Sequence, residues 1–151
     1  MPDAGDAVQI RVATADDADA LVALYTQLAS PSSRLTRPRA IALLGELGRY
    51  PDYHVYLAFR EAHPLGTFAL MIMPTLGARC APAAVVEDVV VDAGARGAGV
   101  GRAMMEFAME RARRAGCYKL VLSSNLARTD AHRFYESLGF RRHGVSFAVE
   151  L

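Results

Sequence analysis

Strand-like and helix-like spacings of apolar residues follow one another in the first half of the chain. Residues 8–13 alternate apolar and polar side chains, as a half-buried strand does. Two stretches with a helical spacing of apolar residues come next, at 15–28 and 36–50, and a segment rich in Ser, Pro and Arg separates them. Thr14 and Thr36 are suited to cap these two predicted helices, because their hydroxyls can accept hydrogen bonds from the first backbone N–H groups.

The second half of the pattern predicts more strands and a long amphipathic helix. Residues 53–60 and 66–73 are strand-like runs on either side of a turn, so they predict an antiparallel hairpin. The later elements, in chain order, are a strand at 85–91, a helix at 100–115, a strand at 119–123, a helix at 130–138 and a last hairpin of residues 140–142 and 145–151.

This order of elements, β-α-α-β-β-β-α-β-α-β-β, predicts an α/β (α+β) fold. We expect a central mixed, mostly antiparallel sheet with helices on both faces. The strand at 119–123 should run parallel to the strand at 85–91, because a helix connects the two. The 151 residues are enough for one core and leave no comfortable room for a second, so residues 1–151 are expected to form a single domain.

Two acidic residues, Glu87 and Asp88, interrupt the β-branched run at 85–91. Because strand side chains alternate, Glu87 should lie on the face of Val89 and Val91, and Asp88 on the other face. At least one carboxylate therefore enters apolar surroundings. Burial of that kind raises the pKa of a carboxyl group toward neutrality, where the group can accept a proton.

A glycine-rich turn joins this strand to the long helix, with the pattern R-x-x-G-x-G over residues 96–101. Glycines at a helix start let the exposed backbone N–H groups approach a phosphate, and Arg96 adds a positive charge. A dinucleotide-binding fingerprint would need glycine where Arg102 or Met104 stands, and a P-loop would need a lysine that is absent. The other interpretation is a plain strand-to-helix connection with a solvated arginine.

The pattern at 96–101 resembles the pyrophosphate loop of the GNAT superfamily of acyl-CoA-dependent N-acyltransferases, and residues 131–140 are similar to its second signature, A-x-x-x-Y-x-x-x-G-F. The resemblance implies acetyl-CoA as the acyl donor, with pantetheine paired to the strand backbone. Arg128 stands where many relatives carry asparagine, so Asn125 is the nearest candidate for that contact. The implied cofactor-binding residues are Val89, Val91, Arg96, Gly97, Ala98, Gly99, Val100, Gly101, Arg102 and Asn125.

The same resemblance implies catalytic roles. Glu87 would be the general base, directly or through water, and Tyr135 would give a proton to the departing thiolate. A backbone N–H, that of Val89, would stabilise the oxyanion. The structural alternatives are an ion-paired Glu87 and a core Tyr135. Asp88 is a second acid that would contact the amine or an arginine, and His132 is either a proton carrier or a surface residue near a helix start.

The acceptor is expected to be a primary amine of a small molecule. The central strand is similar to diamine and aminoglycoside acetyltransferases, whereas the second signature is similar to aminoalkylphosphonate acetyltransferases. Arg34, Arg37 and Arg39 could bind an anionic group of the acceptor, or they could form a solvated loop. Two other functions stay open: a non-catalytic acyl-CoA-binding module, and an acetyltransferase for a protein or peptide amine.

Composition narrows the remaining classes. A hydrophobic share of 52% with 22% charged residues is typical of a globular chain, and a net charge of +1 does not suggest binding to nucleic acid or membrane. The start of the sequence lacks the pattern of a secretory signal, so the cytoplasm is expected. Cys80 and Cys117 are expected to be reduced thiols, and the histidines show no metal-ligand spacing. A homodimer is expected by analogy alone.

Overall fold

The computed structural model describes residues 7–28 and 34–151. They form two compact units, one that extends to Val121 and one that runs from Leu122 to Leu151. The first unit contains β1 (Gln9–Val12), α1 (Ala18–Tyr25), α2 (Arg37–Leu47), β2 (Tyr53–Arg60), β3 (His63–Met73), β4 (Ala83–Val91), α3 (Val100–Arg114) and β5 (Lys119–Val121). The second unit contains α4 (Thr129–Ser137).

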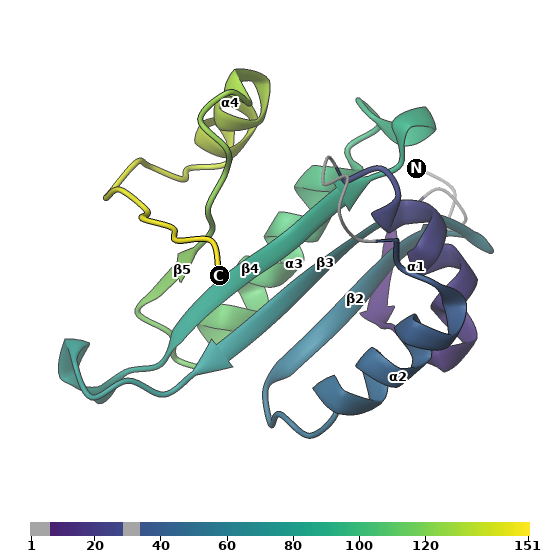
Figure 1. The fold of residues 1–151 in the computed structure, drawn as a ribbon. Helices are drawn as coiled ribbons and strands as arrows, with labels where there is room; N and C mark the ends of the chain where they lie inside the picture. The colour runs from purple at the N-terminus through teal and green to yellow at the C-terminus, as the bar shows by residue number, and fades with distance from the viewer. Residues whose placement is uncertain (1–6, 29–33) are drawn as a thin grey trace. The chain divides into compact units, whose positions relative to one another are not determined.

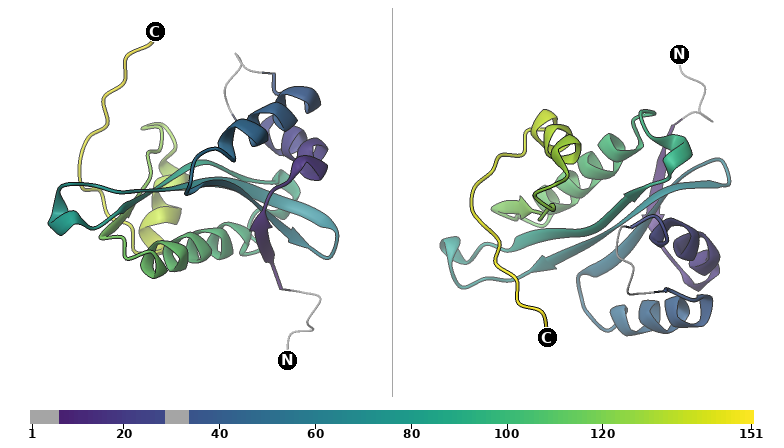
Figure 2. Two further views of the ribbon diagram at one scale, coloured as in Figure 1. Left: turned by 90° about the horizontal axis from the view of Figure 1, so that it is seen from below. Right: turned by 45° about the horizontal axis from the view of Figure 1, so that its top comes forward.

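A five-stranded sheet in the order β1-β2-β3-β4-β5 is the frame of the first unit (Figure 1). Neighbouring strands are antiparallel except β4 and β5, which are parallel. Helices α1 and α2 cover one face and α3 covers the other (Figure 2, left). This confirms the predicted α/β class, a mixed and mostly antiparallel sheet with helices on both faces.

Each face of the sheet has its own apolar layer. On the α1 and α2 side, Leu21 and Leu24 pack on strand residues that include Val55 and Ala69. On the α3 side, the ring of Phe107 lies with its centroid 5.1 Å from that of Tyr56 and 6.3 Å from that of Phe68. Antiparallel pairing explains the division, because directly opposed residues of neighbouring strands share a face.

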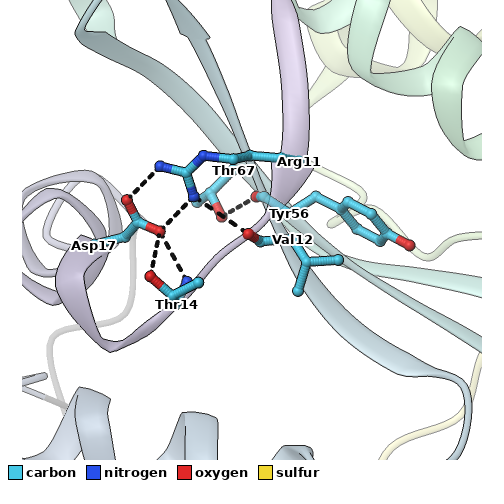
Figure 3. Close-up of polar contacts among 6 residues, drawn as sticks. All are labelled: Arg11, Val12, Thr14, Asp17, Tyr56 and Thr67. Atoms are coloured by element: carbon cyan, nitrogen blue, oxygen red, sulfur yellow. Dashed lines mark hydrogen bonds and ion pairs between the residues drawn. The ribbon is translucent and has the colours of Figure 1, made fainter.

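The connection from β1 into α1 is held by the carboxylate of Asp17 (Figure 3). It accepts hydrogen bonds from the guanidinium of Arg11 at 2.7 and 2.8 Å and from the backbone N–H of Thr14 at 2.8 Å. The bonds from Arg11 lower the pKa of Asp17. Thr14 and Asp17 form a capping box, so the cap predicted at Thr14 is confirmed.

Several boundaries differ from the prediction. The turn before β3 is two residues long, because Arg60 already pairs with His63, and Glu61 supplies a positive φ of 53°. The strand predicted at 119–123 ends at Val121.

The predicted last hairpin is wrong: residues 140–151 contain no helix or strand. Within the C-terminal unit no strand is available to pair with them, and a lone two-stranded hairpin is marginal in water. The alternating residues Val145, Phe147 and Val149 are 80–94% exposed.

Candidate active site

A β-bulge in β4 sets the positions of the two acidic residues. Glu87 lies opposite Ala69 and Val90 lies opposite Thr67, so β4 has two residues where β3 has one. Asp88 is at the bulge and has a φ of 52°, in the left-handed region. Such a conformation costs about 1 kcal/mol or more for a residue with a Cβ. The alternation predicted along 85–91 is therefore broken, and Glu87 shares a face with Val90.

A cavity of about 610 Å³ lies on the α1 and α2 side of the sheet. Asp88 lines it, together with two tyrosines, two arginines and a larger set of aliphatic side chains. Glu87 is directly opposite a lining residue, Ala69, in the strand register. The full lining is Leu21, Tyr25, Leu28, Arg34, Leu35, Arg39, Ala40, Leu43, Leu44, Leu47, Tyr53, Val55, Ala69 and Asp88.

The ionisable groups around this cavity influence one another. Burial raises the pKa of Asp88, and burial together with the charge of Asp88 raises the pKa of Glu87. Burial and then the charge of Asp88 also raise the pKa values of Tyr25 and Tyr53, so both phenols stay protonated at neutral pH. The two tyrosines are site residues that the sequence analysis missed. Their only signal was apolar spacing, which also describes ordinary core residues.

Two of the three arginines proposed to bind an anion line the cavity. Arg34 and Arg39 are lining residues, and both are exposed. The guanidinium of Arg37 instead lies 3.2 Å from the carboxylate of Asp19, and Arg37 is outside the lining. The structure thus divides a cluster that looked uniform in the sequence.

One edge of β4 is open next to the acids. β4 pairs with β5 only from Ala83 to Val85, and among the described residues of this unit the rest of β4 pairs with β3 alone. The backbone groups on the other edge of β4, which include those of Val89 and Val91, have no partner strand among the described residues of this unit. An extended amide-containing chain could pair with such an edge as an added strand would.

The glycine turn leads from the end of β4 into α3. Gly97 and Gly99 both have a φ of 79°, and Gly99 is the N-cap of the helix. A Cβ built on either glycine would meet nothing within 4 Å, so glycine is needed here for backbone conformation and not for packing. The first intrahelical bond is donated by the N–H of Ala103 to the carbonyl of Gly99. The N–H groups of residues 100–102 therefore have no helix acceptor.

These features fit a diphosphate group. Free N–H groups and the helix dipole point toward an open space, and the exposed Arg96 precedes it in the turn. Arg102, in the first turn of α3, forms an exposed ion pair with Glu106 at 3.4 Å. An exposed pair of this kind is weak, so it leaves the guanidinium available to an anion.

The other two predicted site residues belong to the C-terminal unit. Tyr135 packs against Phe134 and Phe140, with ring centroids 5.1 and 5.7 Å apart, and burial raises its pKa although the charge of Arg128 opposes this. Asn125 accepts a hydrogen bond from the N–H of Ala127 through its side-chain oxygen, which leaves its amide NH₂ group as a donor.

His132 is held locally in this unit. Its ring Nε2 lies 2.9 Å from the backbone oxygen of Asn125. Its backbone N–H donates to the backbone carbonyl of Arg128. These contacts tie the start of α4 to the preceding turn.

Over residues 7–28 and 34–151, no three His, Cys, Asp or Glu side chains gather in a way that could hold a metal ion. The helices of that part of the chain are too short or too polar to cross a membrane.

Comparisons with known proteins match these features over most of the chain. The model of the acetyltransferase (GNAT) family matches residues 12–140. Glucosamine 6-phosphate N-acetyltransferase 1 of Oryza sativa subsp. japonica is 33% identical, over 96% of this chain and 88% of the relative. The aminoalkylphosphonate N-acetyltransferase of Salmonella typhimurium is 30% identical, over 95% and 91%. The crystal structure of glucosamine-6-phosphate N-acetyltransferase from Arabidopsis thaliana superposes with a TM-score of 0.83 at 26% identity, over 95% and 98%.

Proposed function

The chain belongs to the GNAT family of acetyltransferases and transfers an acetyl group to the amine of a small molecule, and we propose that acetyl-CoA is its donor and that its acceptor also carries a phosphorus oxyanion. The open edge of β4, which leads directly into the glycine turn, carries the first part of this proposal. It combines a backbone that an amide chain could pair with and a helix start suited to a diphosphate.

The residues that we propose to hold the donor are those that the family resemblance implies. The backbone of Val89 and Val91 would pair with the pantetheine arm, and the turn from Arg96 to Gly101, with Arg102, would bind the pyrophosphate. Asn125 would add an amide donor. When bound, acetyl-CoA supplies a thioester whose carbonyl carbon the amine attacks.

The acidic residues supply the proton acceptor that an ammonium substrate needs. We assign the general base to Glu87, because its pKa is raised by burial and by the neighbouring charge of Asp88. Glu87 takes one proton from the ammonium, and the nitrogen loses a second proton to solvent after the C–N bond forms. The backbone N–H of Val89 would donate to the carbonyl oxygen while that oxygen carries negative charge.

Tyr135 is proposed as the acid that completes the reaction. Its pKa is raised, so the phenol keeps its proton until the C–S bond breaks and the sulfur leaves as a thiolate. The phenol of Tyr135 would then give its proton to that sulfur and recover one from solvent, and Glu87 would release its proton to solvent. The products are an amide, a free thiol and one released proton.

The anionic group of the acceptor is supported by two observations. The two named relatives act on glucosamine 6-phosphate and on aminoalkylphosphonates, and both compounds join an amine to a phosphorus oxyanion. In this chain Arg34 and Arg39 line the cavity, and guanidinium groups bind such oxyanions with paired hydrogen bonds. The homodimer and the cytoplasmic location expected from the sequence stay predictions.

Tyr135→Phe tests the proposed chemistry, because it keeps the ring and removes the proton. Free-thiol release from acetyl-CoA in the presence of an amine panel should be detected for the wild type. The kcat of the variant should fall on the order of ten- to ten-thousand-fold, while the Kd for acetyl-CoA stays close to that of the wild type. Phe134→Leu is the matched control for loss of ring packing. Wild-type turnover by Tyr135→Phe would show that solvent supplies the proton.

A further inference from the structure

The cavity beside β4 is polar at few points and aliphatic elsewhere. Nine of its fourteen lining residues are Leu, Val or Ala, and they come from both helices and from the sheet. Among the described lining residues Asp88 is the one acid, and Arg34 and Arg39 are the cations. The remaining polar atoms are the hydroxyls of Tyr25 and Tyr53. A ligand that fills this space therefore meets charge at a few lining residues and apolar surface at most of the others.

The carboxylate of Asp88 is suited to bind an ammonium group. Among the described residues Asp88 makes no ion pair or hydrogen bond, so its carboxylate can accept from a ligand. The bulge, and not regular alternation, brings it into the lining. The nearby phenols of Tyr25 and Tyr53 are protonated and uncharged, so they neutralise none of the charge of this carboxylate.

The guanidinium groups of Arg39 and Arg34 are suited to bind an oxyanion. Arg39 comes from the first turn of α2, and its guanidinium lies 3.5 Å from the carboxylate of Glu46. Both side chains of that pair are more than half exposed, so the contact is weak and a ligand can replace it. Arg34 adds a second guanidinium to the same lining.

The aliphatic lining should bind an acceptor rich in hydroxyl groups with low affinity. Each hydroxyl that leaves water without a new partner costs affinity, and the aliphatic part of the lining offers none. Among the lining residues that the structure describes, the two tyrosine hydroxyls are the only uncharged side-chain hydrogen-bonding groups. A hexosamine phosphate carries several hydroxyls, whereas an aminoalkyl compound presents methylene groups to the leucines.

Resting on the acetyl transfer proposed above, we infer that the acceptor is an amine with an aliphatic body and a phosphonate or phosphate at its far end. Asp88 holds the ammonium, Arg39 and Arg34 hold the oxyanion, and the leucine-rich wall selects against a sugar. The substrate class then follows the aminoalkylphosphonate enzyme among the relatives and departs from the glucosamine 6-phosphate enzymes.

The test compares kcat/KM for a series of aminoalkylphosphonates, from aminomethyl to aminohexyl, with the values for glucosamine 6-phosphate, for alkylamines of matched length and for spermidine. Aminoalkyl phosphate esters of matched length distinguish a phosphate from a phosphonate. The best aminoalkylphosphonate or phosphate ester should exceed glucosamine 6-phosphate and its matched alkylamine by at least about tenfold. A preferred chain length would report the distance between the carboxylate of Asp88 and the guanidinium groups of Arg34 and Arg39.

Substitutions of lining residues test whether the preference for an anionic, aliphatic amine arises in the cavity. Arg39→Gln should reduce the preference for the anionic amine over the matched alkylamine by about tenfold, and more at low salt. Arg37→Gln is the matched control, because it removes the same charge from the same helix turn outside the lining. Asp88→Asn should raise KM for every amine while Kd for acetyl-CoA is unchanged. Leu44→Asn should narrow the gap between the aminoalkyl compounds and glucosamine 6-phosphate.

The results that would overturn this inference differ from those that would overturn the acetyl transfer. Efficient turnover of glucosamine 6-phosphate or spermidine, or equal effects of Arg39→Gln and Arg37→Gln, would reject the aliphatic anionic acceptor and leave the acetyltransferase intact. Absence of thiol release with every amine would reject the proposed reaction itself.

Discussion

The two faces of the sheet are packed in different ways. On the α3 side Met104 and Met105 are fully buried, and a Cβ on Gly66 would lie 2.7 Å from the sulfur of Met104. On the α1 and α2 side there is a cavity of about 610 Å³ with Asp88 in its lining. On the closely packed face even the Cβ of an alanine at position 66 would meet Met104, whereas the other face holds a cavity. The difference indicates that one face mainly stabilises the fold and the other mainly binds substrate.

The largest effect that would sharpen this comparison is a loss of activity without a loss of stability. Glu87→Gln should lower kcat on the order of a hundred- to ten-thousand-fold, about 3–5 kcal/mol in activation free energy, because the amide cannot accept the proton. Steady-state thiol release and thermal unfolding would be measured together. Glu110→Gln, on the exposed side of α3, should leave kcat unchanged. If both variants behave alike, the acids of β4 are not part of the chemistry.

The wild-type rate should also depend on pH. The pKa of Glu87 is raised, and the base must be ionised to accept a proton, so activity should fall as the pH drops through this raised pKa. Profiles of kcat/KM against pH would show this acidic limb.

A second effect concerns the start of α3, the helix that packs on the closed face, where we propose that the donor binds. Acetyl-CoA at about a hundred times its Kd should stabilise the wild type by roughly 2.7 kcal/mol. Gly99→Val should abolish that shift, because its side chain enters the open space of the turn. The φ of 79° also makes valine unfavourable there, so the unliganded variant should melt lower.

Arg96→Gln serves as the companion to Gly99→Val, since it leaves the backbone unchanged. It should reduce the shift with acetyl-CoA without lowering the baseline stability. A wild type whose melting temperature does not respond to acetyl-CoA would argue against the donor assignment.

A third effect is a loss of stability without a direct role in chemistry. Gly66→Ala should cost about 1–3 kcal/mol in the free energy of unfolding, because its Cβ would be 2.7 Å from the sulfur of Met104 and 2.8 Å from the carbonyl oxygen of Val90. Gly45→Ala in α2 is the control: a Cβ there meets nothing within 4 Å, and alanine should stabilise the helix by up to about 1 kcal/mol. Urea unfolding would distinguish the two, and a neutral Gly66→Ala would mean that the closed face can relax.

The smallest expected effect is a gain in stability, for Asp88→Asn, in contrast to the loss expected for Gly66→Ala. The folded-state pKa of Asp88 is raised, so its contribution to stability is fully present below the unfolded pKa and is lost as the pH rises through the folded pKa. Asp88→Asn should therefore raise the melting temperature slightly at neutral pH and less at acidic pH. Melting curves across pH would check this, with Asp16→Asn as an exposed control. A variant that is less stable at neutral pH would mean that the carboxylate has a stabilising partner.

The parts of the fold that were predictable rest on local rules. The glycines of the turn between β4 and α3 and the cap at Thr14 depend on a few neighbouring residues, so the sequence alone reveals them. The bulge at Asp88 has no such signal, because no glycine or proline marks it and the register is set by β3. The cavity likewise depends on how helices and strands distant in sequence approach one another, which hid Tyr25 and Tyr53. The prediction of the last hairpin was wrong because alternating apolar and polar residues predict an extended segment but do not supply a partner strand.

The backbone at Asp88 also restricts how this enzyme can be re-engineered. A residue with a φ of 52° lies in the left-handed region, where glycine, asparagine, aspartate and histidine are enriched. Aspartate is the only acid among those four, and a lysine or arginine at this position would add backbone strain. Libraries intended to change the charge preference of the cavity should therefore vary position 34, which precedes α2, and position 39, in the first turn of α2, and keep position 88 fixed.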